Sequence, residues 1–84
     1  MDVTIYSKEN CSPCIKTKLL LKQRGIAFNE NKIDVNNPEQ IKEVTSVMAS
    51  HGVEFRSLPQ VIIDNKYIGG FEDVMKYLNE QKDK

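Results

Sequence analysis

The sequence has few metal-binding residues and no excess charge of either sign. It contains only two cysteines and one histidine, and it lacks tryptophan. A closed structural zinc site needs four ligands, so a single copy of the chain cannot build one from cysteine and histidine alone. The 12 basic residues balance the 12 acidic residues, which argues against a surface for nucleic acid or membrane. We therefore expect neither among its partners.

Long hydrophobic segments are also absent. No apolar run is long enough to cross a bilayer, and the first residues lack the pattern of a signal peptide, so we expect a cytoplasmic protein. With 84 residues, 39% of them hydrophobic and 29% charged, the chain is predicted to form one globular domain over 1–84. In a reducing compartment, two nearby cysteines are more often catalytic or metal-binding than structural.

The first half of the sequence predicts two strands and two helices. Alternating residues favour a strand over 3–6, and helix-forming residues favour a helix over 12–24. A second strand is expected over 27–35, where a polar middle suits an exposed sheet edge. The pair Asn37-Pro38 is typical of a helix start, and the helix that follows has apolar residues at helical spacing: Ile41, Val44 and Met48.

The second half predicts a hairpin and a last helix. Strands over 60–63 and 66–68 flank the turn residues Asp64-Asn65. The last helix should bury one apolar stripe, formed by Phe71, Val74, Met75 and Leu78. The resulting order is βαβαββα. It predicts an α/β fold in which a parallel pair and a closing hairpin form a four-stranded mixed sheet with helices on both faces.

Cys11 and Cys14 lie where the first strand passes into the first helix. At about the N-cap, Cys11 faces free N–H groups and the positive end of the helix dipole, and both favour the nucleophilic thiolate. Cys14 shares the expected core face with Thr17. We therefore expect an exposed, attacking Cys11 and a buried, resolving Cys14. Zinc sites also use this spacing, but two cysteines and one histidine cannot complete a closed site in one chain, so the motif and its place at a helix start favour redox exchange.

Ile15 and Leu19 lie opposite the core face of the same helix. They either dock protein partners or provide peripheral packing.

Four segments, in order and in register, resemble the glutaredoxin family over nearly the whole chain. They are Tyr6–Cys14, Arg56–Gln60, Val61–Ile68 and Gly69–Asp73. The resemblance implies a thioredoxin-like fold. It also implies a monomeric oxidoreductase that reduces protein disulfides and glutathione mixed disulfides through Cys11 and Cys14. Glutathione would be its reducing co-substrate, with no permanently bound cofactor and no metal.

The resemblance further implies one side of a glutathione groove. Lys8 would attract the terminal carboxylate of the tripeptide, and Arg56 would help at that end. The main chain of Leu58 would pair with the glutathione cysteine as an added strand. Pro59, preceded by a cis peptide bond, would face the disulfide.

The other end of the implied groove lies at the start of the last helix. Gly69 and Gly70 would let the backbone turn closely, and the N–H groups of Phe71, Glu72 and Asp73 would hold the γ-glutamyl carboxylate. Asp73 would take the γ-glutamyl ammonium group. Acidic residues in a first helical turn are also ordinary partners of the helix dipole, so this feature alone decides nothing.

Two alternatives stay open because Ser12 and Pro13 depart from the commonest cysteine–proline–tyrosine–cysteine pattern of the family. Redoxins that donate electrons to ribonucleotide reductase, and are reduced by thioredoxin reductase, also vary these positions. The Gly69–Asp73 segment favours glutathione instead. The second alternative is an iron–sulfur carrier, in which two Cys11 thiolates and two glutathiones bridge a cluster between two chains. Ser12 favours that alternative and Pro13 opposes it.

Overall fold

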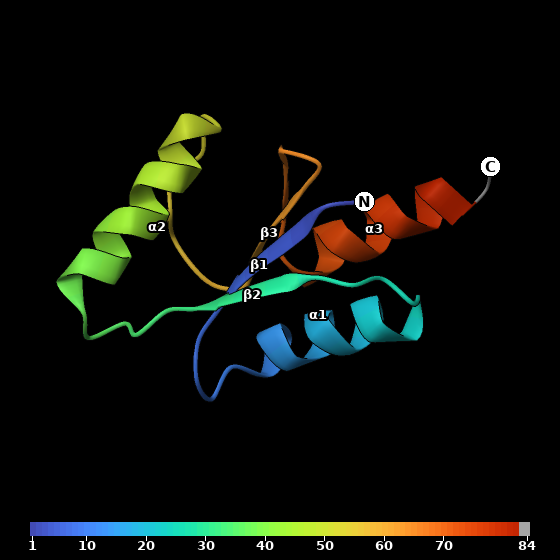
Figure 1. Ribbon diagram of the computed structural model, residues 1–84, viewed down its shortest axis with the longest axis horizontal. Coiled ribbons are helices and arrows are strands. Elements are labelled where there is room, and N and C mark those ends of the chain that lie inside the picture. The colour runs from blue at the N-terminus through green and yellow to red at the C-terminus, as the bar shows by residue number, and fades with distance from the viewer. Residues whose placement is uncertain (83–84) are drawn as a thin grey trace.

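A computed structural model describes residues 1–82, in which strands and helices follow the predicted order βαβαββα (Figure 1). The strands are β1 (Val3–Ser7), β2 (Asn29–Lys32), β3 (Gln60–Ile63) and β4 (Lys66–Gly69). The helices are α1 (Ser12–Gln23), α2 (Pro38–Ser50) and α3 (Phe71–Lys82).

The strands form one mixed sheet in the order β2-β1-β3-β4. β1 is parallel to β2 and antiparallel to β3, and β4 closes the sheet as the hairpin partner of β3. Helix α2 covers one face, and α1 and α3 lie together on the other (Figure 1). The predicted α/β class, with a four-stranded mixed sheet and helices on both faces, is confirmed.

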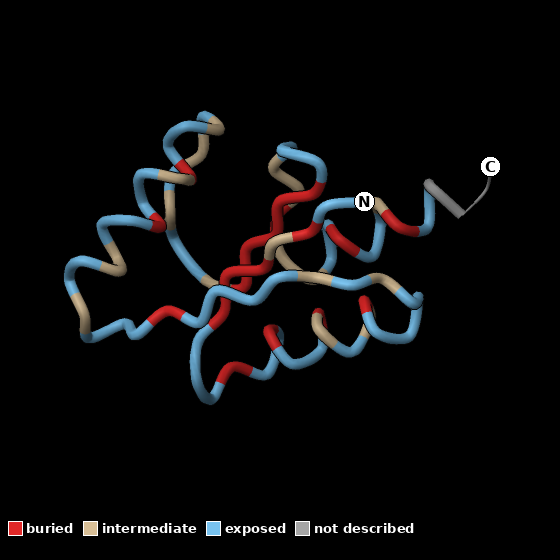
Figure 2. Tube along the Cα trace, in the orientation of Figure 1, coloured by how far each residue is buried: buried red, intermediate tan, exposed pale blue. Residues whose placement is uncertain are grey.

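Alternation along the two central strands explains why both faces are covered. In β1, Ile5 points toward α1 and α3, whereas its neighbour Tyr6 points toward α2. Each set of inward residues anchors its own buried cluster. The burial is concentrated on β1 and β3, while every residue of the edge strand β2 is exposed (Figure 2).

Two boundaries differ from the sequence predictions. β2 covers only Asn29–Lys32 of the expected 27–35, because its partner β1 ends at Ser7 and the chain then turns at Asp34. Met75 was expected to be buried but is 36% exposed. The buried stripe of α3 is narrower than predicted, since Val74 and Leu78, one turn apart, already fill the contact with the sheet.

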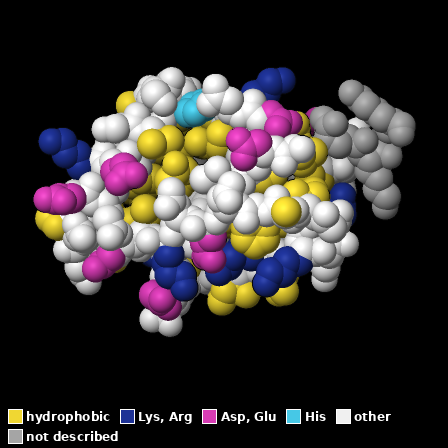
Figure 3. All heavy atoms as spheres, viewed as in Figure 1, with side chains coloured by type: hydrophobic (Ala, Val, Ile, Leu, Met, Phe, Trp, Pro, Cys, Tyr) yellow, Lys and Arg dark blue, Asp and Glu magenta, His cyan; other side chains and the backbone are white. Residues whose placement is uncertain are grey.

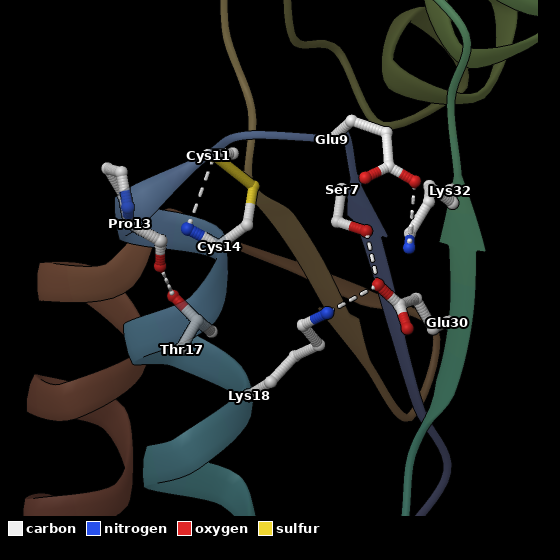
Figure 4. A network of polar contacts seen from close by, with 9 residues as sticks. All are labelled: Ser7, Glu9, Cys11, Pro13, Cys14, Thr17, Lys18, Glu30 and Lys32. Carbon is white, nitrogen blue, oxygen red and sulfur yellow. Dashed lines mark hydrogen bonds and ion pairs between the residues drawn. A yellow bond between two sulfur atoms is a disulfide. The ribbon is translucent and has the colours of Figure 1, made fainter.

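A polar network ties α1 to the edge of the sheet, one turn of helix beyond Cys14. Glu30 on β2 accepts hydrogen bonds from the buried hydroxyl of Ser7 on β1 (2.6 Å) and from the Lys18 ammonium on α1 (2.8 Å) (Figure 4). The hydrogen bond from Lys18, followed by that from Ser7, lowers the pKa of the Glu30 carboxyl below its ordinary 4.5. The network therefore joins the helix that carries both cysteines to two strands of the sheet.

The depressed pKa of Glu30 predicts a pH-dependent contribution to stability. The contribution is present above about pH 4.5 and is lost as the pH falls through the lower pKa of the folded protein. Because both partners keep some solvent exposure, we expect Glu30→Gln to lower the free energy of unfolding by about 0.5–1 kcal/mol at pH 7. The difference from the unmodified protein should shrink toward zero at acidic pH.

Urea unfolding of the oxidised protein over a series of pH values measures this contribution. Glu9→Gln is the matched control, because the Glu9–Lys32 ion pair is much more exposed and should contribute little. A stability difference for Glu30→Gln that stays constant across the whole pH range would contradict the assignment.

Candidate active site

Cys11 is the N-cap residue of α1, and its own sulfur accepts the capping hydrogen bond. Its backbone is extended (φ −118°, ψ 103°), and Sγ accepts from the main-chain N–H of Cys14 at 3.3 Å. Cys11 and Cys14 form a disulfide, so the structure shows the oxidised state (Figure 4). The predicted helix-start position of Cys11 is confirmed. A helix N–H and the helix dipole both point at the sulfur that would carry negative charge after reduction.

The two cysteines differ less in exposure than the sequence suggested. Cys14 is 1% exposed and lies on the core face of α1 with Thr17, as expected, but Cys11 is only 5% exposed. Two contacts contribute to this burial: the bond to the buried Cys14, and a distant segment whose Leu58 carbonyl oxygen lies 3.9 Å from Cys11 Sγ. A disulfide sulfur has no proton to donate, so the approach of Leu58 is a van der Waals contact in the oxidised state.

The segment that reaches Cys11 through Leu58 is Ser57–Pro59, which leads into β3. The Leu58–Pro59 peptide bond is cis, as the family resemblance implied. Pro59 is buried, whereas Leu58 is half-buried and packs on the cluster beneath α2. The main chain at Leu58 is therefore held directly beside the reactive sulfur.

The start of α3 lies next to Pro59 and extends the line of backbone groups that begins at Cys11 and Leu58. A Cβ atom added to Gly70 would lie 3.6 Å from the Pro59 carbonyl oxygen, so the two main chains pass close together. The Gly70 N–H donates to the Asp73 carboxylate at 3.2 Å. Gly69 has a φ of +128°, and any Cβ there would overlap that carboxylate, so only glycine fits. Asp73 is thus seated over the Gly69-Gly70 turn.

The structure brings the expected site residues together unequally. Cys11, Leu58, Pro59, Gly70 and Asp73 form the continuous row just described. Two further predicted residues, Phe71 and Glu72, follow in the first turn of α3.

Within residues 1–82, neither predicted basic residue makes a hydrogen bond to this row. Lys8 is exposed and lines an open hollow of about 550 Å³ that continues past Asn10 to Lys32 and Gln40. Arg56 is highly exposed, and its guanidinium pairs with Glu54 at 3.3 Å. Arg56 is thus paired with a residue of its own loop.

The outer face of α1 carries the predicted apolar residues. Ile15 is 53% exposed and Leu19 is 51% exposed, which confirms that they face away from the core. Figure 3 shows hydrophobic atoms beside Lys and Arg side chains along the side of the molecule formed by α1.

Two polar residues near the site, Gln60 and Tyr67, were given no role in the site from the sequence. Gln60, at the head of β3, is 8% exposed. Its amide donates to the Ser57 carbonyl at 2.8 Å and accepts from the Tyr67 hydroxyl at 2.7 Å. The sequence signal that could have revealed this is a glutamine that begins an otherwise apolar strand, since a buried amide must find partners.

Membrane spans and metal clusters are not found in the described part of the chain. Within residues 1–82, no helix combines the length and apolarity that crossing a membrane would require. The same residues gather no group of three or more His, Cys, Asp or Glu side chains around a point where a metal ion could sit.

Comparison with known sequences agrees with this geometry. The family model described as Glutaredoxin matches residues 3–68. A probable glutaredoxin from Synechocystis is 38% identical over 72 residues, which cover 86% of this chain and 76% of the relative. Glutaredoxin 3 from Escherichia coli is 33% identical over 73 residues, covering 87% of this chain and 81% of the relative.

Solved structures give the same result. Glutaredoxin 1 from Francisella tularensis, complexed with cacodylate, superposes with a TM-score of 0.81 at 28% identity, covering 99% of this chain and 98% of that one. A buckwheat glutaredoxin in complex with glutathione gives a TM-score of 0.78 at 26% identity, covering 95% of this chain and 70% of that one. The cysteine pair at the start of α1, the matching family model and these similar proteins agree. The chain therefore belongs to the glutaredoxin family of thiol–disulfide oxidoreductases.

Proposed function

We propose that the chain reduces protein disulfides and glutathione mixed disulfides, with glutathione as its reductant. The observation that carries the proposal is the capping hydrogen bond from the Cys14 N–H to Cys11 Sγ. A sulfur placed at a helix start is stabilised as the thiolate, and the thiolate is the form that attacks disulfides. Cys14, buried on the core face three residues later, is available to resolve the intermediate.

The reaction with a protein disulfide has two exchange steps. The Cys11 thiolate attacks one sulfur, forming a mixed disulfide and releasing the other sulfur as a thiolate. Cys14, as a thiolate, then attacks Cys11 Sγ, which frees the second substrate sulfur and leaves the Cys11–Cys14 disulfide. Two glutathione thiols then reduce that disulfide and leave as one molecule of glutathione disulfide, so two electrons pass in total.

A glutathione mixed disulfide needs only one of the cysteines. The Cys11 thiolate attacks the glutathione sulfur and releases the protein thiolate. A second glutathione then attacks the Cys11–glutathione disulfide, which restores the Cys11 thiolate and gives glutathione disulfide.

Glutathione is favoured by the row of groups that starts at Cys11. The Leu58 main chain beside the sulfur offers backbone groups with which the tripeptide could pair in an extended conformation. The first turn of α3 offers N–H groups for an anion, and Asp73 offers a carboxylate for a cation. These two charges match the γ-glutamyl end of glutathione. The buckwheat relative solved with glutathione supports the same choice.

The choice of reductant is tested by coupled turnover. A disulfide substrate is supplied with NADPH and either glutathione plus glutathione reductase or thioredoxin reductase alone. The proposal expects sustained NADPH consumption with the glutathione system. Turnover with thioredoxin reductase alone would overturn it and favour the electron donor to ribonucleotide reductase.

The two cysteines should fail differently when replaced. Cys11→Ser should abolish all exchange, because the attacking thiolate is gone. Cys14→Ser should lose reduction of protein disulfides yet keep a substantial part of the activity on a glutathionylated peptide, which needs no resolving thiol. Equal loss of activity on the glutathionylated peptide in both variants would show that the assigned roles are wrong.

Glutathione affinity should depend on Asp73 more than on Glu72. Asp73→Asn keeps an oxygen that accepts from the Gly70 N–H but removes the charge that would hold the γ-glutamyl ammonium. A charge-assisted hydrogen bond contributes about 1.5–3 kcal/mol, and exposure of Asp73 reduces that value. We expect the Michaelis constant for glutathione to rise about three- to tenfold.

Steady-state kinetics with varied glutathione measures this effect, with Glu72→Gln as the matched control on the same helical turn. The rate of alkylation of Cys11 should be unchanged in both variants. A larger effect from Glu72→Gln, or none from either variant, would mean that the acidic pair serves only the helix dipole.

A further inference from the structure

The segment beside Cys11 is held by a hydrogen-bonded relay that begins on β4. The Tyr67 hydroxyl donates to Gln60 Oε1 at 2.7 Å, and Gln60 Nε2 donates to the Ser57 carbonyl at 2.8 Å. Ser57 directly precedes Leu58, whose own carbonyl contacts Cys11 Sγ at 3.9 Å. Three contacts therefore lead from the far strand of the sheet to the reactive sulfur.

The directions of these hydrogen bonds are fixed by chemistry. A main-chain carbonyl only accepts, so the amide nitrogen of Gln60 must face Ser57, and Oε1 is left for the Tyr67 hydroxyl. Burial, followed by the charge of Asp73, raises the pKa of Tyr67 above its ordinary 10. The hydroxyl therefore stays protonated at neutral pH and acts as the donor.

The burial of Gln60 makes the relay costly to break. The side chain is 8% exposed and has only these two protein partners within residues 1–82. If the Tyr67 hydroxyl is removed, Oε1 stays inside without a partner, or the amide rotates and releases Ser57. Either outcome loosens the main chain at Leu58.

The starting point of the relay is next to the other end of the site. Tyr67 and Asp73 line one hollow of about 270 Å³ at the edge of β4. Asp73 is seated over the Gly69-Gly70 turn through its bond to the Gly70 N–H. The relay thus runs from the neighbourhood of Asp73 to the segment that contacts Cys11 through Leu58.

We propose that Tyr67 and Gln60 are positioning residues that hold the Leu58 main chain in place for the glutathionyl group of the substrate. This inference rests on the proposed function. Neither side chain touches the reacting sulfurs, so neither takes part in the chemistry. Their effect is on how well the substrate is bound and aligned, because a backbone segment pairs with an extended peptide only when its N–H and C=O groups are held in position.

Tyr67→Phe is the main test, since it removes one hydroxyl and keeps the ring. With a short peptide carrying a glutathione mixed disulfide, its KM should rise about three- to tenfold while kcat and the rate of Cys11 alkylation stay unchanged. Tyr6→Phe is the matched control. Tyr6 is the cross-strand neighbour of Gln60 on β1, and its hydroxyl makes no hydrogen bond to any group of the described chain. Its KM should not change.

Gln60→Met provides a second variant, with a side chain of similar length that makes neither bond. Its KM should rise at least as far as that of Tyr67→Phe. The double variant Tyr67→Phe/Gln60→Met should be no worse than Gln60→Met alone, because the hydroxyl acts only through the amide. Thermal unfolding of each variant confirms that the kinetics are those of folded protein.

The outcomes distinguish failure of the positioning role from failure of the proposed glutathione-dependent activity. An unchanged KM in Tyr67→Phe, or a fall in kcat with KM intact, would overturn the positioning role while leaving glutathione-dependent activity standing. Additive effects in the double variant would overturn the relay. If the unmodified protein fails to turn over the glutathionylated peptide with glutathione, both proposals are overturned.

Discussion

The candidate active site is built around one hydrogen bond, from the Cys14 N–H to the sulfur of Cys11. It makes the nucleophile the cap of its own helix, so the same contact that starts α1 also stabilises the charge that the chemistry needs. The sequence around it serves that arrangement. β1 ends at Ser7, a short loop leads to Cys11, and Pro13 occupies an early helical position where a missing N–H costs little.

The rest of the fold brings distant segments to that sulfur. β3 begins just after Pro59, so its position places Leu58 beside the disulfide. β4 ends at the Gly69-Gly70 turn, where the Gly70 N–H donates a hydrogen bond to the Asp73 carboxylate. The network centred on Glu30 anchors α1 from the other side. A small sheet with helices on both faces therefore places a nucleophile, the backbone segment before β3 and a helix start in one continuous row.

The sequence predicted the parts of this row that depend on local patterns. The helix start at Cys11 follows from residue types and spacing, while the cis bond before Pro59 was implied by the resemblance. The burial of Cys11 was missed, because part of it comes from a contact with Leu58, 47 residues away. The contacts of Gln60 and Glu30 also join segments whose register no local pattern fixes. Met75 was misplaced because helical spacing gives a periodicity but not the exact rotation of α3 against the sheet.

The central claim is that the start of α1 stabilises a Cys11 thiolate even though Cys11 is almost fully buried. Burial alone would raise the pKa of the thiol, whereas the helix N–H group and dipole lower it. The direct measurement is the pH dependence of iodoacetamide alkylation in the reduced Cys14→Ser variant, which isolates Cys11. The account predicts a pKa for the Cys11 thiol below the roughly 8.5 of a free thiol. A value at or above 8.5 would contradict it, because burial would then outweigh the helix.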